Sequence, residues 1–342
     1  MNKKSVSNTQ KEFDVLLRHI IKTRAKVFTK ANTALIDLYW LIGKTINQKV
    51  QSEAWGKGVV SELAKYIAIN APDIKGFSDK NLWRMKQFYE TYRHNKKLST
   101  LVRELSWSHN LVVFSRCKTD EEREFYLTLS KQENYSFREL ERQISASFFE
   151  RTMLGNTKLS TVLRELQPTI NHTFKDNYVL EFLGLPKTHN ENDLQKALIQ
   201  NMKDFILELG RDFIFIGEEY RLQVGNQDFY IDLLFYHRGL SALAAIELKV
   251  GKFLPEHLGQ LNFYLEALDR DVKKPHENPS IGILLCRDKD DEVVEYALSR
   301  NLSPALIAQY QLLLPDKKLI QDKLHQLYEQ NLLDKTNKNS EV

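Results

Sequence analysis

Two apolar runs between residues 229 and 249 each carry charged residues at places where a buried strand normally has none. The first run is residues 230–236 (YIDLLFY), and the second is residues 243–249 (LAAIELK). Residues 237–240 (HRGL) separate the runs, and Gly239 is free to adopt a positive φ there. The pattern therefore predicts a β-hairpin. Asp232, inside the first run, is costly in a strand unless it is paired or binds a metal.

The second run places two charges on one face of the predicted sheet. Glu247 and Lys249 are two residues apart, so their side chains point the same way from a strand. If the hairpin pairs across its turn, the carboxylate of Asp232 converges with that of Glu247. Two carboxylates beside an ammonium group form a site for a hard cation with a water-orienting partner. The other interpretation is a structural ion pair between Asp232 and Lys249.

The size and composition of the chain are those of an ordinary two-domain protein. Its 342 residues are 42% hydrophobic and 27% charged, and this length favours about two domains. No apolar run is long enough for a transmembrane helix, and the polar residues 1–13 lack the apolar core of a signal peptide. Cys117 and Cys286 are far apart and belong to no metal-ligand spacing, which suits free thiols in the cytoplasm.

The net charge of +4 hides an asymmetry between the two halves. Residues 1–175 contain 30 Lys and Arg against 18 Asp and Glu, whereas the remaining residues contain 19 against 27. A basic N-terminal half suits a module that binds a polyanion, because neutralising phosphates supplies most non-specific affinity for nucleic acid. The alternative is a helical half that is rich in lysine without a polyanion partner.

Helical periodicity dominates this basic half. The apolar spacing predicts one long helix, or two with a bend, over residues 12–50, and further helices over residues 58–70 and 79–92. The turn before residue 79 contains Gly76, and Ser78 is a good N-cap. Helix, turn and polar-faced helix together are typical of a helix-turn-helix. The candidate nucleic-acid contacts are Lys75, Ser78, Lys80, Arg84, Arg138 and Arg142. The alternative is a solvated basic surface.

The pattern changes from helical to alternating after residue 210. We place the domain boundary near residue 175, which gives an all-α domain over residues 1–175 and a second domain over residues 176–342. A helix is expected over residues 191–210, and the order that follows is β-β-β-α-β-α-β. This order describes a mixed α/β sheet flanked by helices, with one antiparallel hairpin and a parallel crossover.

Longer strings of sequence carry a family resemblance. FYIDLLFYHRGL and AIELKVGKFLPEHLGQLNFYLEALD in the second half, with GFSDKNLWRMKQFYETY and ELSWSHN in the first, resemble the YhcG-like nucleases of the PD-(D/E)XK superfamily. The resemblance implies a restriction-endonuclease-like domain that cuts phosphodiester bonds with Mg²⁺, or with Mn²⁺ in its place. It implies that Asp232 and Glu247 bind the metal, that Lys249 orients the attacking water, and that Gln260 lies against the site.

One position departs from the pattern of that superfamily. Members often place a Glu on the helix before the first strand, close to the metal, whereas the equivalent stretch here (ENDLQ, residues 191–195) has a Gln at that position. Glu191 or Asp193 compensates, or that ligand is absent; Glu218 is another spare carboxylate. Two histidines are weaker candidates. His237 follows a strand as a candidate proton carrier or phosphate contact, and His257 is expected to be exposed and without a role.

The resemblance and the residues together favour a Mg²⁺-dependent nuclease that acts on DNA, with a homodimer implied by analogy with double-strand cutters. Two alternatives stay open. One is a catalytically silent nucleic-acid-binding protein, and the other is a protein-interaction subunit of a restriction-like or mobile-element system.

Overall fold

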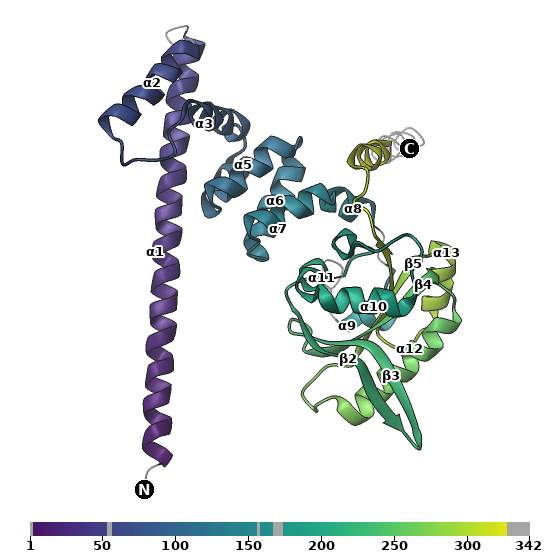
Figure 1. Cartoon of the computed structure of the whole chain (residues 1–342). Helices are drawn as coiled ribbons and strands as arrows, with labels where there is room; N and C mark the ends of the chain where they lie inside the picture. Colours follow the sequence, from purple (N-terminus) through teal and green to yellow (C-terminus); the bar gives the residue numbers. More distant parts are fainter. Residues whose placement is uncertain (1–2, 53–56, 156–157, 167–173, 327–342) are drawn as a thin grey trace, which may run out of the picture. The chain divides into compact units, whose positions relative to one another are not determined.

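The chain divides into two compact units, residues 1–144 and 145–342. The computed structural model describes residues 3–52, 57–155, 158–166 and 174–326 (Figure 1). None of the helices in these ranges is long and apolar enough to cross a membrane.

The two units meet about thirty residues before the boundary expected near residue 175. The reason is that described residues between 145 and 166 pack into the C-terminal unit. Leu159 and Leu163 are buried in the core of that unit. The guanidinium of Arg151 donates a hydrogen bond of 2.7 Å to the carbonyl oxygen of Asn177. Helical sequence alone did not show which domain residues 145–166 join.

The N-terminal unit is all helical, as predicted. The helices are α1 (Lys3–Gln51), α2 (Lys57–Asn70), α3 (Asp79–Tyr92), α4 (Lys96–Leu101), α5 (Trp107–Arg116), α6 (Asp120–Gln132) and α7 (Phe137–Ser145), with a 3₁₀ turn at Val102–Glu104. The sequence left open whether residues 12–50 form one helix or two, and they form one.

Close packing of α3 on the C-terminal part of α1 organises this unit. A Cβ atom added to Gly43 of α1 would overlap the carbonyl oxygen of Met85 in α3, so glycine allows the two backbones to approach. The ring of Trp40 packs edge-on against Phe88 and Tyr89, with ring centroids 5.8 and 5.1 Å away. The turn before α3 contains Gly76 at a φ of 97°, and the hydroxyl of Ser78 caps the helix. α2, the turn and α3 therefore follow one another as the local pattern predicted, and a role of this segment in DNA binding stays a prediction.

The C-terminal unit is a six-stranded mixed sheet flanked by helices. The elements before the long strands are α8 (Phe148–Leu154), α9 (Thr161–Leu166), β1 (Asn177–Val179), a 3₁₀ turn at Glu181–Leu183, α10 (Glu191–Gln200) and α11 (Met202–Leu209). The others are β2 (Phe213–Val224), β3 (Gln227–His237), β4 (Ala242–Lys252), α12 (Glu256–Ala267), a π-helical turn at Leu268–Val272, β5 (Ile281–Asp288), α13 (Asp291–Ser299) and β6 (Ala305–Gln311). The strand order is β1-β6-β5-β4-β3-β2.

The sheet combines the antiparallel and parallel connections that the sequence predicted. β2, β3 and β4 pair antiparallel, whereas β4, β5, β6 and β1 pair parallel. α9, α10 and α11 cover one face of the sheet with an apolar core, and α12 and α13 cover the other (Figure 1). The α/β sheet and its hairpin are confirmed.

Two local expectations were wrong in detail. The helix expected over residues 191–210 is broken at Asn201, which leaves helical geometry at φ −112° and ψ 29°. In the turn between β3 and β4, the positive φ belongs to Ser241 and not to Gly239. Gly239 instead lies close to Asp212, because an added Cβ would come within 3.2 Å of that carboxylate.

Candidate active site

The candidate site lies where β3 and β4 separate. Their ladder runs from His237 opposite Ala242 to Leu233 opposite Ile246. Beyond that point the rest of β3 pairs with β2, while β4 continues along β5. Asp232 and Glu247 are the next residues on each strand, so the two carboxylates occupy the fork between the strands. The hairpin therefore brings them together as predicted.

Asp232 is held from two sides. Its carboxylate accepts a hydrogen bond of 2.8 Å from the backbone N–H of Leu248, and its carbonyl oxygen accepts one of 3.1 Å from the side-chain amide of Gln195. Burial raises the pKa of Asp232, and although the Leu248 N–H and the charge of Lys249 oppose the rise, Glu191 and Glu219 add to it. The carboxylate is thus fixed in place by the fold.

Glu247 is the most buried charged group of the site, with 2% of its surface exposed. Its Oε1 atom accepts a hydrogen bond of 3.1 Å from Lys249, whereas its buried Oε2 atom accepts none from the described residues. Burial and then the neighbouring carboxylate of Asp232 raise the pKa of Glu247 to about 7. An ionised Glu247 therefore needs a further positive partner.

Lys249 lies between two carboxylates. Its ammonium nitrogen is 3.1 Å from Glu247 and 3.5 Å from Oε2 of Glu191. Burial lowers the pKa of Lys249, but the charges of Glu247, Glu191 and Asp232 outweigh burial and leave it raised. Lys249 is therefore charged at neutral pH and shares a face with Glu247, as the spacing predicted. The alternative of a simple Asp232–Lys249 ion pair does not describe this geometry, since Lys249 bonds to Glu247.

The extra carboxylates come from both sides of the fork. Glu191, at the start of α10, contacts Lys249, whereas the carboxylate of Asp193 accepts a bond from the backbone N–H of Asn190 in a capping box. Glu218 pairs opposite Leu233, which places its neighbour Glu219 beside Asp232. Sequence reasoning missed Glu219, because the irregularity between Phe215 and Gly217 changes the alternation along β2.

Gln260 lies on α12 and reaches the site through a tyrosine. Its side-chain amide donates a hydrogen bond of 2.7 Å to the hydroxyl of Tyr264. Burial raises the pKa of Tyr264, and although the bond from Gln260 opposes the rise, the charges of Glu247 and Asp232 add to it. The side chain of Gln260 is exposed. A role of Gln260 at the site stays a prediction, and Tyr264 is a neighbour of the site that the sequence did not single out.

The two histidines differ from their expected environments. His237 lies at the far end of the β3–β4 ladder, buried between the rings of Phe174 and Phe213, and its Nδ1 atom accepts the N–H of Leu240. This buried position agrees with the alternative that His237 is neither a proton carrier nor a phosphate contact. His257 is half-buried, and burial together with the charge of Lys249 lowers its pKa. His257 is therefore close enough to Lys249 to be affected by its charge, and it is less exposed than expected.

The residues at the fork fit a small hard cation. Within the described ranges, no group of three or more His, Cys, Asp or Glu side chains is arranged to bind a metal ion. Mg²⁺ does not require such a group, because it keeps several water ligands and uses one or two carboxylates. The free Oε2 of Glu247 beside Asp232 is the kind of ligand that it takes. The fork thus suits a divalent cation that keeps water ligands better than a metal bound by protein groups alone.

The predicted nucleic-acid contacts form two groups in the N-terminal unit. Ser78 caps α3, Lys75 bonds to the carbonyl oxygen of Pro72 in the preceding turn, and Lys80 and Arg84 follow on α3 itself. Arg138 and Arg142 lie one turn apart on α7. Lys75, Ser78, Lys80 and Arg138 are exposed, whereas Arg84 and Arg142 are half-buried.

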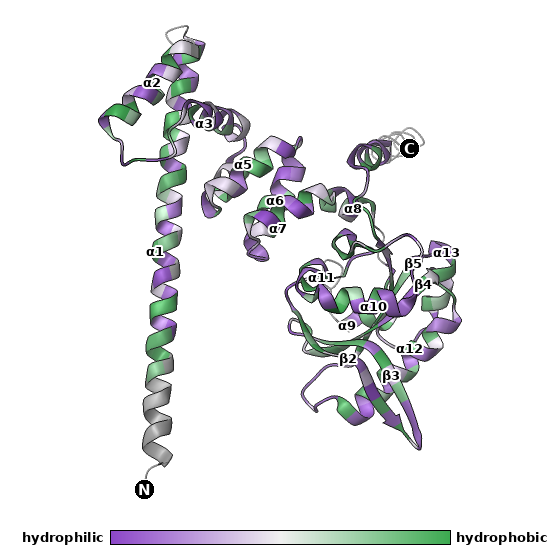
Figure 2. Cartoon of the chain, viewed as in Figure 1, coloured by the Kyte–Doolittle hydropathy of each residue, from purple (hydrophilic) through white to green (hydrophobic). Residues whose placement is uncertain are grey.

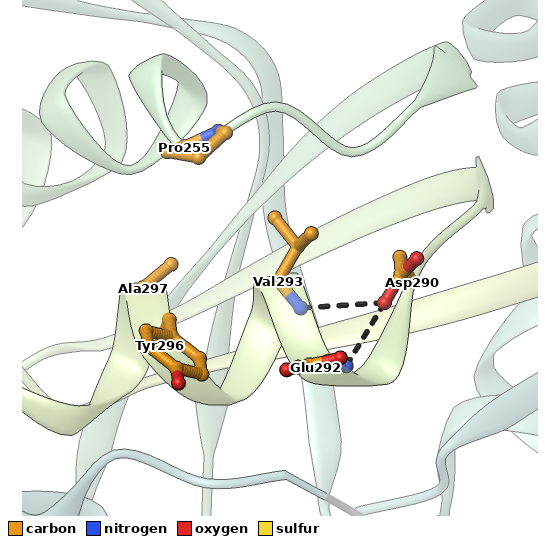
Figure 3. Close-up of a pocket in the computed structure, with 6 residues that line it drawn as sticks. All are labelled: Pro255, Asp290, Glu292, Val293, Tyr296 and Ala297. Carbon is orange, nitrogen blue, oxygen red and sulfur yellow. Dashed lines mark hydrogen bonds between the residues drawn. The ribbon is translucent and has the colours of Figure 1, made fainter.

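A separate hollow in the C-terminal unit does not contain the site. It has a volume of about 490 Å³ and is lined by Pro255, Asp290, Glu292, Val293, Tyr296 and Ala297 (Figure 3). The carboxylate of Asp290 caps α13 by accepting the N–H groups of Glu292 and Val293. Neither carboxylate of the fork lines this hollow.

Known proteins match both halves of the chain. The model of the YhcG PDDEXK nuclease domain matches residues 171–325, and that of the DUF1016 N-terminal domain matches residues 16–151. A protein of Escherichia coli (strain K12) named "Putative nuclease YhcG" is 32% identical over 352 residues, which covers 92% of this chain and 93% of the relative. The chain belongs to the YhcG nuclease family. The PDDEXK family resemblance and the restriction-endonuclease-like fold predicted from the sequence are confirmed.

Membership of the YhcG family places the fork inside the PDDEXK nuclease domain, since Asp232 and Glu247 fall within the matched residues. Among solved structures, a repair endonuclease from Pyrococcus abyssi is similar with a TM-score of 0.24 and 15% identity, over 38% of this chain and 50% of that chain. A likeness of that size adds nothing to the assignment.

Proposed function

We propose that this YhcG-family chain is a Mg²⁺-dependent nuclease that hydrolyses phosphodiester bonds in DNA. Asp232 and Glu247 hold the ion, and Lys249 orients the attacking water or stabilises the transition state. Mn²⁺ replaces Mg²⁺ in the same site. Glu191 is the further carboxylate at the site, in place of Asp193 or Glu218.

One observation carries the proposal. The buried Oε2 atom of Glu247 has no hydrogen-bond partner among the described residues, and it belongs to a carboxyl group beside that of Asp232. Leaving a buried charged oxygen unpaired costs free energy unless a cation binds there. The ammonium of Lys249 satisfies only the other oxygen. The arrangement therefore supports a cation between the two carboxylates.

The residues around the fork have separate roles in the proposed reaction. When bound, the metal neutralises charge on the phosphate and lowers the pKa of a water ligand. The Leu248 N–H and the Gln195 amide hold Asp232 in position. Lys249, whose charge is maintained by Glu247 and Glu191, places a positive group where negative charge grows on the phosphate.

The basic N-terminal unit supports DNA as the substrate. We propose that Lys75, Ser78, Lys80 and Arg84 around the start of α3, with Arg138 and Arg142 on α7, contact the phosphate backbone. Polyanion binding by such residues loses affinity steeply with added salt. Cutting both strands of a duplex with one site per chain takes two copies, so a homodimer is part of the proposal. We propose that the protein acts in the cytoplasm, where it encounters DNA.

Cleavage of defined substrates tests the proposal. Supercoiled plasmid, linear duplex and single-stranded RNA are incubated with the protein in Mg²⁺, in Mn²⁺ or in EDTA. We expect cleavage of DNA in either metal and none in EDTA, and we expect Asp232→Asn to be inactive. Salt-sensitive DNA binding without cleavage in any condition would contradict the nuclease and favour the silent binder.

A further inference from the structure

The N-terminal part of α1 carries a long apolar face that its own unit leaves uncovered. Eleven large apolar side chains of α1 between residues 13 and 41 are exposed, with exposed fractions from 40% to 64%. Figure 1 shows α2 and α3 against the C-terminal part of the helix, with the N-terminal part extending beyond them. Figure 2 shows apolar segments recurring along that extension. An apolar surface of this extent on a protein marks an interaction site.

The uncovered face extends beyond the side of α1 that packs inside the unit. Ile36, Tyr39 and Ile46 are buried and form, with Gly43, a stripe against α3. At 3.6 residues per turn, Leu38 and Leu41 fall on a different side of the helix and are exposed. α3 therefore cannot cover both sides, and the exposed face continues without a break into the N-terminal extension.

The spacing along this face is that of a helix that packs against another helix. Alternating steps of four and three residues pass through Leu17, Ile21, Arg24, Phe28, Ala31, Leu35 and Leu38. Apolar residues at this spacing form the seam of a coiled coil, in which the side chains of one helix insert between those of its partner. Arg24 is the polar member of the seam, and its guanidinium lies over the ring of Phe28, 5.8 Å from the centroid.

The length and the area of the apolar face on α1 indicate what kind of partner covers it. The face extends over about 29 residues, or roughly 40 Å of helix. The next longest helices of the same unit, α2 and α3, have 14 residues each, and among the described elements no other matches α1. The ten exposed apolar side chains that lie on this face, at on the order of 100 Å² each, are enough for the roughly 800 Å² per partner of a stable interface.

The distribution of charge allows two copies of this helix to meet. Lys22 and Lys26 are exposed and project from the side of α1 opposite Ile20. When two such helices pair through their apolar faces, these lysines point away from the seam on both copies. We propose that two copies of this chain associate through the apolar faces of their α1 helices, which leaves the basic sides outward.

The oligomeric state of the full chain tests this proposal. Sedimentation velocity is measured in EDTA without nucleic acid, so the result is independent of the proposed nuclease activity. We expect wild type to sediment at twice its chain mass of 40.1 kDa. Leu17→Gln combined with Ile20→Gln removes apolar contacts at exposed positions of the helix, and we expect it to raise the dimer dissociation constant at least about 100-fold.

Matched control variants show whether a loss of the dimer comes from the apolar face or from a change in the helix itself. Lys22→Gln combined with Lys26→Gln changes the opposite side of the same helix and should leave the dimer intact. Circular dichroism checks that each variant keeps the wild-type helix content, and Phe28→Gln provides a second disruption at an independent position. A wild type that stays monomeric at 50 µM, or apolar-face variants that dimerise like wild type, would overturn the proposal. A monomer that binds anionic phospholipid vesicles would assign the face to a lipid surface instead.

Discussion

At the scale of single residues, Glu247 determines how the site responds to pH. Its pKa is raised from 4.5 to about 7 by burial and by Asp232, so near neutral pH the metal-free protein holds a proton there that an unfolded chain does not. Metal binding requires the deprotonated carboxylate. Protonation of Glu247 and binding of the cation therefore compete.

A pH series of stability tests this competition. Between pH 4.5 and 7 the folded state binds more protons than the unfolded state, so the metal-free protein loses stability as pH rises through this window. We expect a loss on the order of 2 kcal/mol, which Glu247→Gln should abolish. Calorimetry in EDTA measures it, with the exposed Glu256→Gln as the control. Saturating Mg²⁺ should stabilise wild type more at pH 8 than at pH 5; equal stabilisation at both values would contradict this account.

Gln195 positions Asp232 through its backbone and offers a second prediction. Gln195→Leu removes the 3.1 Å bond to the carbonyl oxygen of Asp232 and places an apolar side chain of similar size in the buried position. Groups that support metal ligands in this way typically contribute 10- to 100-fold. We therefore expect cleavage and Mn²⁺ affinity to fall about 10- to 100-fold together. Gln200→Leu, an exposed change on the same helix, should alter neither. A variant with normal Mn²⁺ affinity would show that Gln195 has no positioning role.

The sequence predicted the residues of the fork but not their surroundings. Asp232, Glu247 and Lys249 were predictable because charges inside apolar strands are unusual and because strand periodicity places two of them on one face. Glu219 was not, since a local irregularity in β2 alters the facing of its residues. The roles of Gln195 and Tyr264 also depend on how α10 and α12 pack on the sheet, which periodicity does not specify.

At the scale of elements, the approach of α1 and α3 depends on one glycine. Replacing a helix-interior glycine with alanine usually stabilises a helix by roughly 0.5–1 kcal/mol. At Gly43 the added methyl group would overlap the carbonyl oxygen of Met85, so the helices must separate. We expect Gly43→Ala to destabilise the N-terminal unit by about 1–3 kcal/mol.

Tryptophan fluorescence measures this effect selectively, because all four tryptophans lie in residues 40–107. Gly58→Ala in α2 is the matched control, since an added Cβ there meets no atom within 4 Å. It should leave stability unchanged or slightly raised. If both alanine variants unfolded at the same urea concentration as wild type, the close contact would not be a determinant of this unit.

Element types were predictable from periodicity, whereas their ends and breaks were not. The helix expected over residues 191–210 carries an unbroken apolar pattern, yet it divides at Asn201, whose side-chain amide bonds to the carbonyl oxygen of Ala197. The positive φ in the β3–β4 turn moved from Gly239 to Ser241. Such details depend on contacts with distant residues, here with Asp212 beside Gly239.

At the scale of the whole molecule, the division of the chain can be tested with fragments. Residues 145–342 retain Leu159, Leu163 and the two cations near the buried Glu208, namely Arg151 at 3.6 Å and Lys175 at 3.3 Å. Residues 176–342 lose all four groups and leave Glu208 without these partners. Because an uncompensated buried charge costs about 3–5 kcal/mol, we expect the shorter fragment to melt at a much lower temperature. Equal melting temperatures for the two fragments would favour the boundary at residue 175.

The rate of plasmid cleavage by Lys249→Met tests the central claim most directly. This variant keeps both carboxylates and removes only the ammonium group beside them, so we expect Mn²⁺ and DNA binding close to wild type and cleavage at least about 100-fold slower. Lys252→Met, an exposed change on the same strand, is the control and should cleave at the wild-type rate. Cleavage by Lys249→Met at the rate of Lys252→Met would contradict the assignment of the active site to the β3–β4 fork.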